Sequence, residues 1–86
     1  MEIRFKSKPS NIEQFLLSRK FDNDSRNKKR WYGDEVTIVE EQKEDCYVLN
    51  IMAVRGPAES GEGVLKSFKE IFKEHYKELI LEDYSI

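Results

Sequence analysis

The chain has 86 residues, 37% of them charged and 38% hydrophobic, so we expect one domain, residues 1–86, with a single modest core. Its one cysteine, Cys46, excludes an internal disulfide, and a cytoplasmic location is the simplest expectation. No apolar run is long enough to span a membrane, so no membrane association is expected.

The predicted elements begin with a strand at Glu2–Lys6, where apolar and charged residues alternate. A helix should follow, with Ser10 as its cap and Glu13 completing a capping box. Its core-facing residues are expected to be Ile12, Phe15 and Leu16. The polar stretch of residues 22–29 reads as a loop.

The second half of the chain predicts a hairpin, a helix and a last strand. Val36–Val39 is a β-branched strand, and residues 40–45 form a charged turn. Cys46–Val54 is apolar on both faces apart from Asn50, which is typical of a strand covered on both sides. Apolar residues then recur at helical spacing from Val64 to about Tyr76, and Leu79–Leu81 reads as a short strand.

This order, β-α-β-β-α-β, indicates an α/β (α+β) domain with a mixed sheet. Two folds fit it. One is a ferredoxin-like sandwich, in which two helices cover one face of the sheet. The other depends on residues 49–68, in which a strand, a loop at residues 55–60 and Gly61-Glu62-Gly63 precede a helix.

Residues 49–68 resemble the strand, pyrophosphate loop and helix of the GNAT superfamily of acyl-CoA N-acyltransferases. The resemblance implies a fold like the front half of that family. It also implies that Val54, Gly61, Glu62 and Gly63 bind acetyl-CoA or coenzyme A, with backbone amides at a helix N-terminus holding the pyrophosphate. Ala58 stands where the family motif has Arg or Gln, and the family's later elements have no counterpart here. The implied site is therefore a weakened one in a truncated, degenerate member.

Charge is distributed unevenly along the chain. Residues 1–30 hold nine Lys/Arg and four Asp/Glu, whereas residues 31–86 hold six and thirteen. The basic part ends in a run with adjacent aromatic residues, namely Arg26, Lys28, Lys29, Arg30, Trp31 and Tyr32. We expect this segment to be exposed and to contact an acidic protein rather than nucleic acid, because the net charge is −2. The alternative interpretation is an ordinary solvated loop.

The leading functional hypothesis is a small GNAT-like domain that acts by binding a partner protein. One alternative is a minimal active N-acetyltransferase completed by a second copy, and another is a ferredoxin-like regulatory or inhibitor module. A hydrophobic edge at Leu79–Leu81 predicts a homodimer. We expect His75 to be packed or partly buried rather than a catalytic base, and the acidic residues 40–45 to be a solvated turn rather than a metal site. No catalytic residue is predicted.

Overall fold

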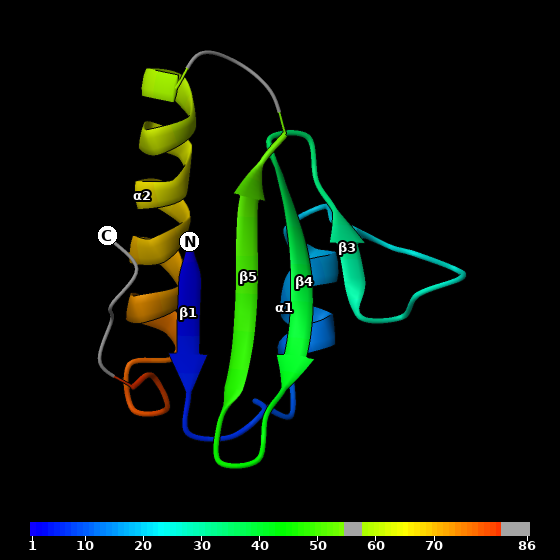
Figure 1. Cartoon of the computed structure of the whole chain (residues 1–86), viewed down its shortest axis with the longest axis vertical. Helices are drawn as coiled ribbons and strands as arrows, with labels where there is room; N and C mark the ends of the chain where they lie inside the picture. Colours follow the sequence, from blue (N-terminus) through cyan, green and yellow to red (C-terminus); the bar gives the residue numbers. More distant parts are fainter. Residues whose placement is uncertain (55–57, 82–86) are drawn as a thin grey trace.

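The computed structural model describes the backbone of residues 1–54 and 58–81, and the side chains of residues 1–54 and 63–81. The elements in chain order are β1 (Glu2–Phe5), α1 (Ile12–Ser18), β2 (Asp22–Asn23), β3 (Arg30–Tyr32), β4 (Val36–Gln42), β5 (Tyr47–Ala53) and α2 (Ala58–His75). The five strands form one sheet in the order β1-β5-β4-β3-β2 (Figure 1). The protein is therefore a small α+β domain.

Every pairing between these strands is antiparallel, so the prediction of a mixed sheet is wrong for the part of the chain described. The predicted hairpin is confirmed: β4 pairs with β5 along its full length, with Ile38 opposite Ile51. The strand order of neither predicted fold is confirmed. Two short strands were not predicted. Strand β2 lies in the expected loop of residues 22–29, and β3 lies where no element was expected.

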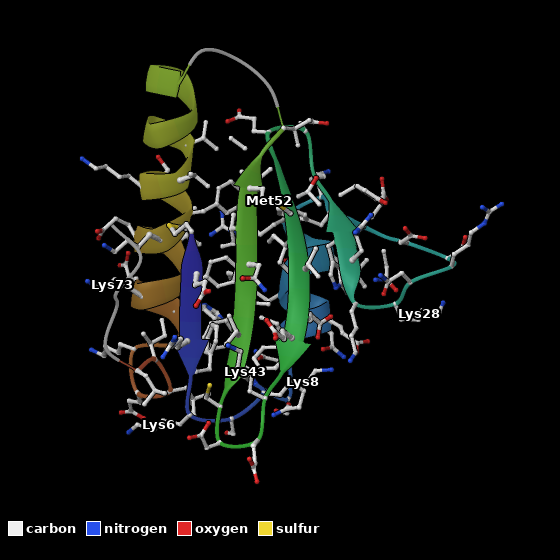
Figure 2. The ribbon with its side chains drawn as sticks, in the orientation of Figure 1. Lys6, Lys8, Lys28, Lys43, Met52 and Lys73 are labelled. Carbon is white, nitrogen blue, oxygen red and sulfur yellow. The ribbon has the colours of Figure 1, made fainter. Side chains whose placement is uncertain are left out.

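Both helices lie on the same face of the sheet (Figure 1). Along β4, Val36, Ile38 and Glu40 are buried, whereas the residues between them are partly exposed. The core between this face and the helices consists of Ile3, Phe5, Ile12, Phe15, Leu16, Phe21, Trp31, Val36, Ile38, Tyr47, Leu49, Ile51, Phe72 and Tyr76. The expectation that β5 is covered on both sides holds only at its start. On the face opposite the helices Val48 is buried, whereas Met52 is 48% exposed (Figure 2).

Helix α1 begins differently from the capping prediction. Its cap position is Asn11, and no side chain bonds to the free amides there, so the predicted capping box of Ser10 and Glu13 is wrong. Glu13 instead lies 3.7 Å from the Lys8 ammonium. After the helix, Lys20 adopts a positive φ of 69°, and the chain turns so that the N–H of Phe21 donates to the Leu16 carbonyl.

The chain returns to the sheet after α2. Ile80 forms an isolated antiparallel bridge with Phe5, flanked by hydrogen bonds from the Lys6 N–H to the Leu79 carbonyl and from the Leu81 N–H to the Arg4 carbonyl. Residues 79–81 thus lie along the outer edge of β1. The predicted last strand is present only as this bridge, and the homodimer stays a prediction. No helix in the described part of the chain is long and apolar enough to cross a membrane.

Candidate functional site: the basic loop and the pocket at Glu40

The residues predicted to bind coenzyme A do not form a turn. Helix α2 begins at Ala58, so Gly61, Glu62 and Gly63 lie within its first two turns, and the expected turn at these residues is wrong. Gly63 is the sixth helical residue, so its N–H belongs to the hydrogen-bonded ladder of the helix rather than to its free end. The N–H of Val54 donates to the Glu35 carbonyl. Residues 55–57, part of the expected loop at residues 55–60, lie outside the described residues.

The basic residues lie in and beside the loop between β2 and β3, which we call the basic loop (residues 24–30). It projects from one side of the sheet (Figure 1). The side chains of Arg26, Lys28, Lys29 and Arg30 are all exposed, as predicted. Arg30 also forms part of β3, which pairs with β4. The loop therefore presents four cations from a segment that is anchored to the sheet at both ends.

Polar groups within and beside the basic loop form hydrogen bonds with its backbone and with each other. The Asp24 carboxylate accepts hydrogen bonds from the N–H of Arg26 at 2.8 Å and of Asn27 at 3.3 Å, and from the Tyr32 hydroxyl at 2.8 Å. The hydrogen bond from the Arg26 N–H, and next the one from the Tyr32 hydroxyl, hold the pKa of Asp24 below its usual value. The Asn27 carboxamide accepts from the Lys29 N–H. The predicted loop is therefore an internally bonded turn.

The two aromatic residues after the loop have different environments. Trp31 is only 2% exposed and belongs to the core, so its predicted place in an exposed partner-binding segment is wrong. The alternation of β3 explains this, because Arg30 and Tyr32 face solvent on either side of it. Tyr32 is 42% exposed. In the strand register it lies opposite Thr37, which in turn lies opposite Met52, so the open face carries a row with two exposed large side chains beside the basic loop.

Behind the loop, Glu40 forms a buried polar cluster, whereas a solvated turn was expected at residues 40–45. Its side chain is 7% exposed, and both carboxylate oxygens accept hydrogen bonds. Oε2 accepts from the Trp31 indole N–H at 2.8 Å, and Oε1 from the Tyr47 hydroxyl at 2.6 Å. The Lys8 ammonium lies 3.4 Å from Oε1. Burial, and secondarily the bond to Glu40, raises the pKa of the Tyr47 phenol, which keeps its proton throughout the physiological range.

An open pocket of about 270 Å³ lies between this cluster and the basic loop. Its lining comes from three stretches of the sequence, residues 8–13, 28–29 and 40–47, and consists of Lys8, Glu13, Lys28, Lys29, Glu40, Gln42 and Tyr47. Figure 2 shows Lys28 beside β3 and Lys8 near the end of β4. Backbone bonding links the two parts of the site, since the Glu40 N–H donates to the Lys29 carbonyl at 2.7 Å.

The charges around this pocket are unbalanced. Lys8 pairs with both Glu13 and Glu40, at 3.7 and 3.4 Å. Within residues 1–54 and 63–81, no carboxylate lies within ion-pair distance of Lys28 or Lys29. The lining therefore holds three ammonium groups and two carboxylates, an excess of one positive charge.

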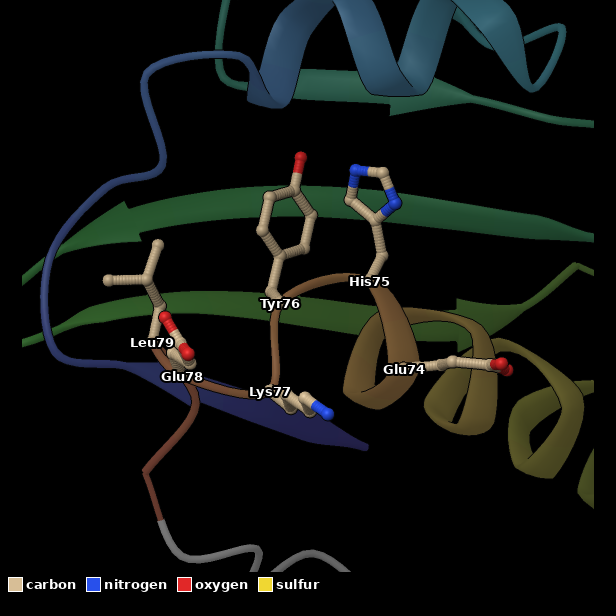
Figure 3. Close-up of a pocket in the computed structure, with 6 residues that line it drawn as sticks. All are labelled: Glu74, His75, Tyr76, Lys77, Glu78 and Leu79. Atoms are coloured by element: carbon tan, nitrogen blue, oxygen red, sulfur yellow. The ribbon is translucent and has the colours of Figure 1, made fainter.

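A second hollow, of about 240 Å³, lies at the end of α2 and is lined in part by His75, Tyr76 and Leu79 (Figure 3). A packed or partly buried His75 was expected; the residue is exposed, but its ring packs on Phe15 with centroids 4.4 Å apart, which agrees with a packed histidine. The Tyr76 hydroxyl donates to the Asn11 carboxamide at 3.0 Å. These contacts give both residues a role in joining α2 to α1.

The described residues contain no group of three or more His, Cys, Asp or Glu side chains arranged to hold a metal ion. Comparisons with known proteins add no assignment: no family model matches the chain, and neither the curated proteins nor the solved structures searched contain a match. The resemblance to the GNAT superfamily stays a prediction.

Proposed function

We propose that the protein is a non-catalytic binding module that docks on an acidic protein surface through its basic loop. The single observation that carries the proposal is the construction of this loop. Four exposed cations are mounted on a turn that Asp24 and Asn27 hold in place by hydrogen bonds. A surface that is already ordered loses less conformational entropy on binding than a mobile tail would.

The open face of the sheet supplies a second component of the proposed interface. Charges steer a partner and accelerate association, whereas affinity requires desolvated anchors. Tyr32 and Met52, 42% and 48% exposed, lie in one row across the strands next to the basic loop. Aromatic residues and methionine are enriched at protein interfaces. An acidic surface with an apolar centre would complement both features.

A nucleic-acid partner is less well supported. The chain carries a net charge of −2, which disfavours attachment to a polyanion away from the loop. Binding of acetyl-CoA or coenzyme A, and acyl transfer with it, also stay predictions. Gly63 lies inside α2, so its N–H belongs to the hydrogen-bonded ladder and is not available to a pyrophosphate.

The test compares two variants with equal changes of charge. In the loop variant, glutamine replaces Arg26, Lys28, Lys29 and Arg30; in the control variant, it replaces Lys43, Lys66, Lys73 and Lys77. Figure 2 shows Lys73 and Lys28 on opposite sides of the molecule. The probes are a short Glu-rich peptide and a single-stranded oligonucleotide of equal charge, titrated at physiological ionic strength.

We expect the wild type and the control variant to bind the peptide and the loop variant to lose it, mainly through slower association. Circular dichroism of both variants would show whether the fold is retained. Equal peptide binding by the two variants would refute the proposal. Tighter binding of the oligonucleotide than of the peptide would favour nucleic acid instead.

A further inference from the structure

We infer that the pocket beside Glu40 is a subsite for one oxyanion group, a carboxylate or a phosphate, carried by the partner. This inference rests on the proposed function and deepens it, because it names the place where an acidic group of the partner would be held. The lining residues that would contact the group are Lys8, Lys28 and Lys29.

The size of the pocket suits a single ionic group. Its volume of about 270 Å³ lies just below the range of roughly 300–1,000 Å³ that is usual for sites enclosing a whole small molecule. A water occupies about 30 Å³ of liquid, so the pocket holds one carboxylate or phosphate together with a few waters. Being open to solvent, it admits a group that remains attached to a larger partner.

The buried carboxylate does not cancel the attraction for an anion. Both oxygens of Glu40 already accept hydrogen bonds, and Lys8 lies against one of them. Lys28 and Lys29 have no ion-pair partner among the residues that the structure describes. An ammonium has three N–H donors, so Lys8 can contact Glu13, Glu40 and an incoming oxygen together. An anion here would therefore meet three ammonium groups against the two carboxylates of Glu13 and Glu40, so the lining keeps an excess of one positive charge.

Trp31 provides a specific reporter for the test. It is the only tryptophan of the chain, and its indole N–H bonds to the Glu40 carboxylate that forms part of the pocket wall. We would titrate the protein at pH 7 with inorganic phosphate and, separately, with glutarate, and follow the indole and the Glu40 amide by NMR. Ionic strength would be held constant with sodium chloride, and chloride alone would be the blank.

We expect saturable shifts of both signals. Lys29→Gln should weaken binding about fivefold, the change that corresponds to loss of one exposed ion pair. Lys73→Gln, on the opposite side of the molecule, should leave anion binding unchanged. The two titrations distinguish the sources: tighter binding of glutarate favours an Asp/Glu side chain, and tighter binding of phosphate a phosphoryl group. Shifts that follow chloride, or equal effects of the two variants, would overturn the inference.

This test can fail separately from that of the proposed function. Saturable binding of free anions without binding of the Glu-rich peptide would keep the subsite and reject the docking surface. Peptide binding without any response of Trp31 to the free anions would keep the docking surface and reject the subsite. If Lys29→Gln proves unstable, Lys28→Gln removes a second lining cation and tests the same point.

Discussion

The hydrogen bond from Tyr47 to Glu40 should make one of the larger polar contributions to stability. Tyr47 is 1% exposed, and its hydroxyl donates to Glu40 Oε1 at 2.6 Å. A hydrogen bond to a charged group contributes about 1.5–3 kcal/mol. In Tyr47→Phe the bond is lost, while Lys8 and Trp31 still contact the carboxylate and keep it partly satisfied. We therefore expect Tyr47→Phe to lower the free energy of unfolding by about 1.5–3 kcal/mol at pH 7.

The same residue should affect stability at alkaline pH. Burial, followed by the bond to Glu40, raises the pKa of Tyr47 above its ordinary value of 10.0. Above pH 10 the unfolded chain therefore loses this proton while the folded chain keeps it. The stabilisation linked to the Tyr47 proton is present in full below pH 10. Above pH 10 its loss lowers the free energy of unfolding by about 1.4 kcal/mol for each further pH unit. Burial also raises the pKa of Tyr76. The stability of Tyr47→Phe should therefore still fall somewhat above pH 10.

Urea unfolding followed by circular dichroism at pH 7, 10 and 11 tests both statements. Tyr32→Phe is the matched control, since its hydroxyl also donates to a carboxylate, that of Asp24, but at an exposed site. We expect this control to cost less than Tyr47→Phe and to keep the wild-type dependence on pH. If Tyr47→Phe unfolds at the same urea concentration as the wild type, or declines as steeply above pH 10, the reasoning about the buried cluster is wrong.

Four further substitutions test the core and the helix by their urea midpoints. Phe72 is 1% exposed, so Phe72→Ala should lower the free energy of unfolding by about 3–5 kcal/mol. Phe68 is only partly buried, so Phe68→Ala should lower it less, and equal losses would contradict the observed burial. Gly33→Ala should destabilise by about 1–3 kcal/mol, because its new methyl would lie 2.7 Å from the ring of buried Phe21; an unchanged midpoint would show that the ring can move aside. Gly63→Ala should stabilise by up to about 1 kcal/mol, since nothing lies within 4 Å of the added carbon in α2, and a lower midpoint would argue against a helix there.

Elements with a strong hydrophobic period could be predicted from the sequence. The alternation in Glu2–Phe5 and the two apolar runs of the β4–β5 hairpin correspond to observed strands. The short strand β3 was missed because its state depends on pairing with β4, where Trp31 lies opposite Ile38, rather than on a local pattern. The start of α2 was misplaced because glycine disfavours a helix without forbidding it.

The candidate site was only half predictable. The basic loop was identified from its charges, but Glu40 was assigned to a charged turn because four of the next five residues are also charged. Extending the alternation of Val36 and Ile38 by one step would have placed Glu40 on the buried face. Lys8 offered no comparable signal, because only the tertiary fold brings it to a carboxylate more than thirty residues away.

The buried carboxylate poses a final question, since an apolar cluster of similar volume is often no less stable than a buried ion pair. Glu40→Gln separates stability from anion binding. The carboxamide can still accept from Trp31, but its bonds are no longer charge-assisted and Lys8 loses a counter-charge. We expect the free energy of unfolding to fall by about 1–2 kcal/mol, as neutral hydrogen bonds replace charged ones.

The affinity of the Glu40 pocket for phosphate should change in the opposite direction. Replacing the carboxylate by a neutral amide removes one negative charge from the wall, so Lys8, Lys28 and Lys29 act on the anion with less opposition. Phosphate titrations of folded Glu40→Gln, followed by the Trp31 indole signal, would measure this. Weaker phosphate binding in a fully folded variant would mean that Glu40 orients the lysines rather than opposing the anion, and that the charge balance assumed for the pocket is incorrect.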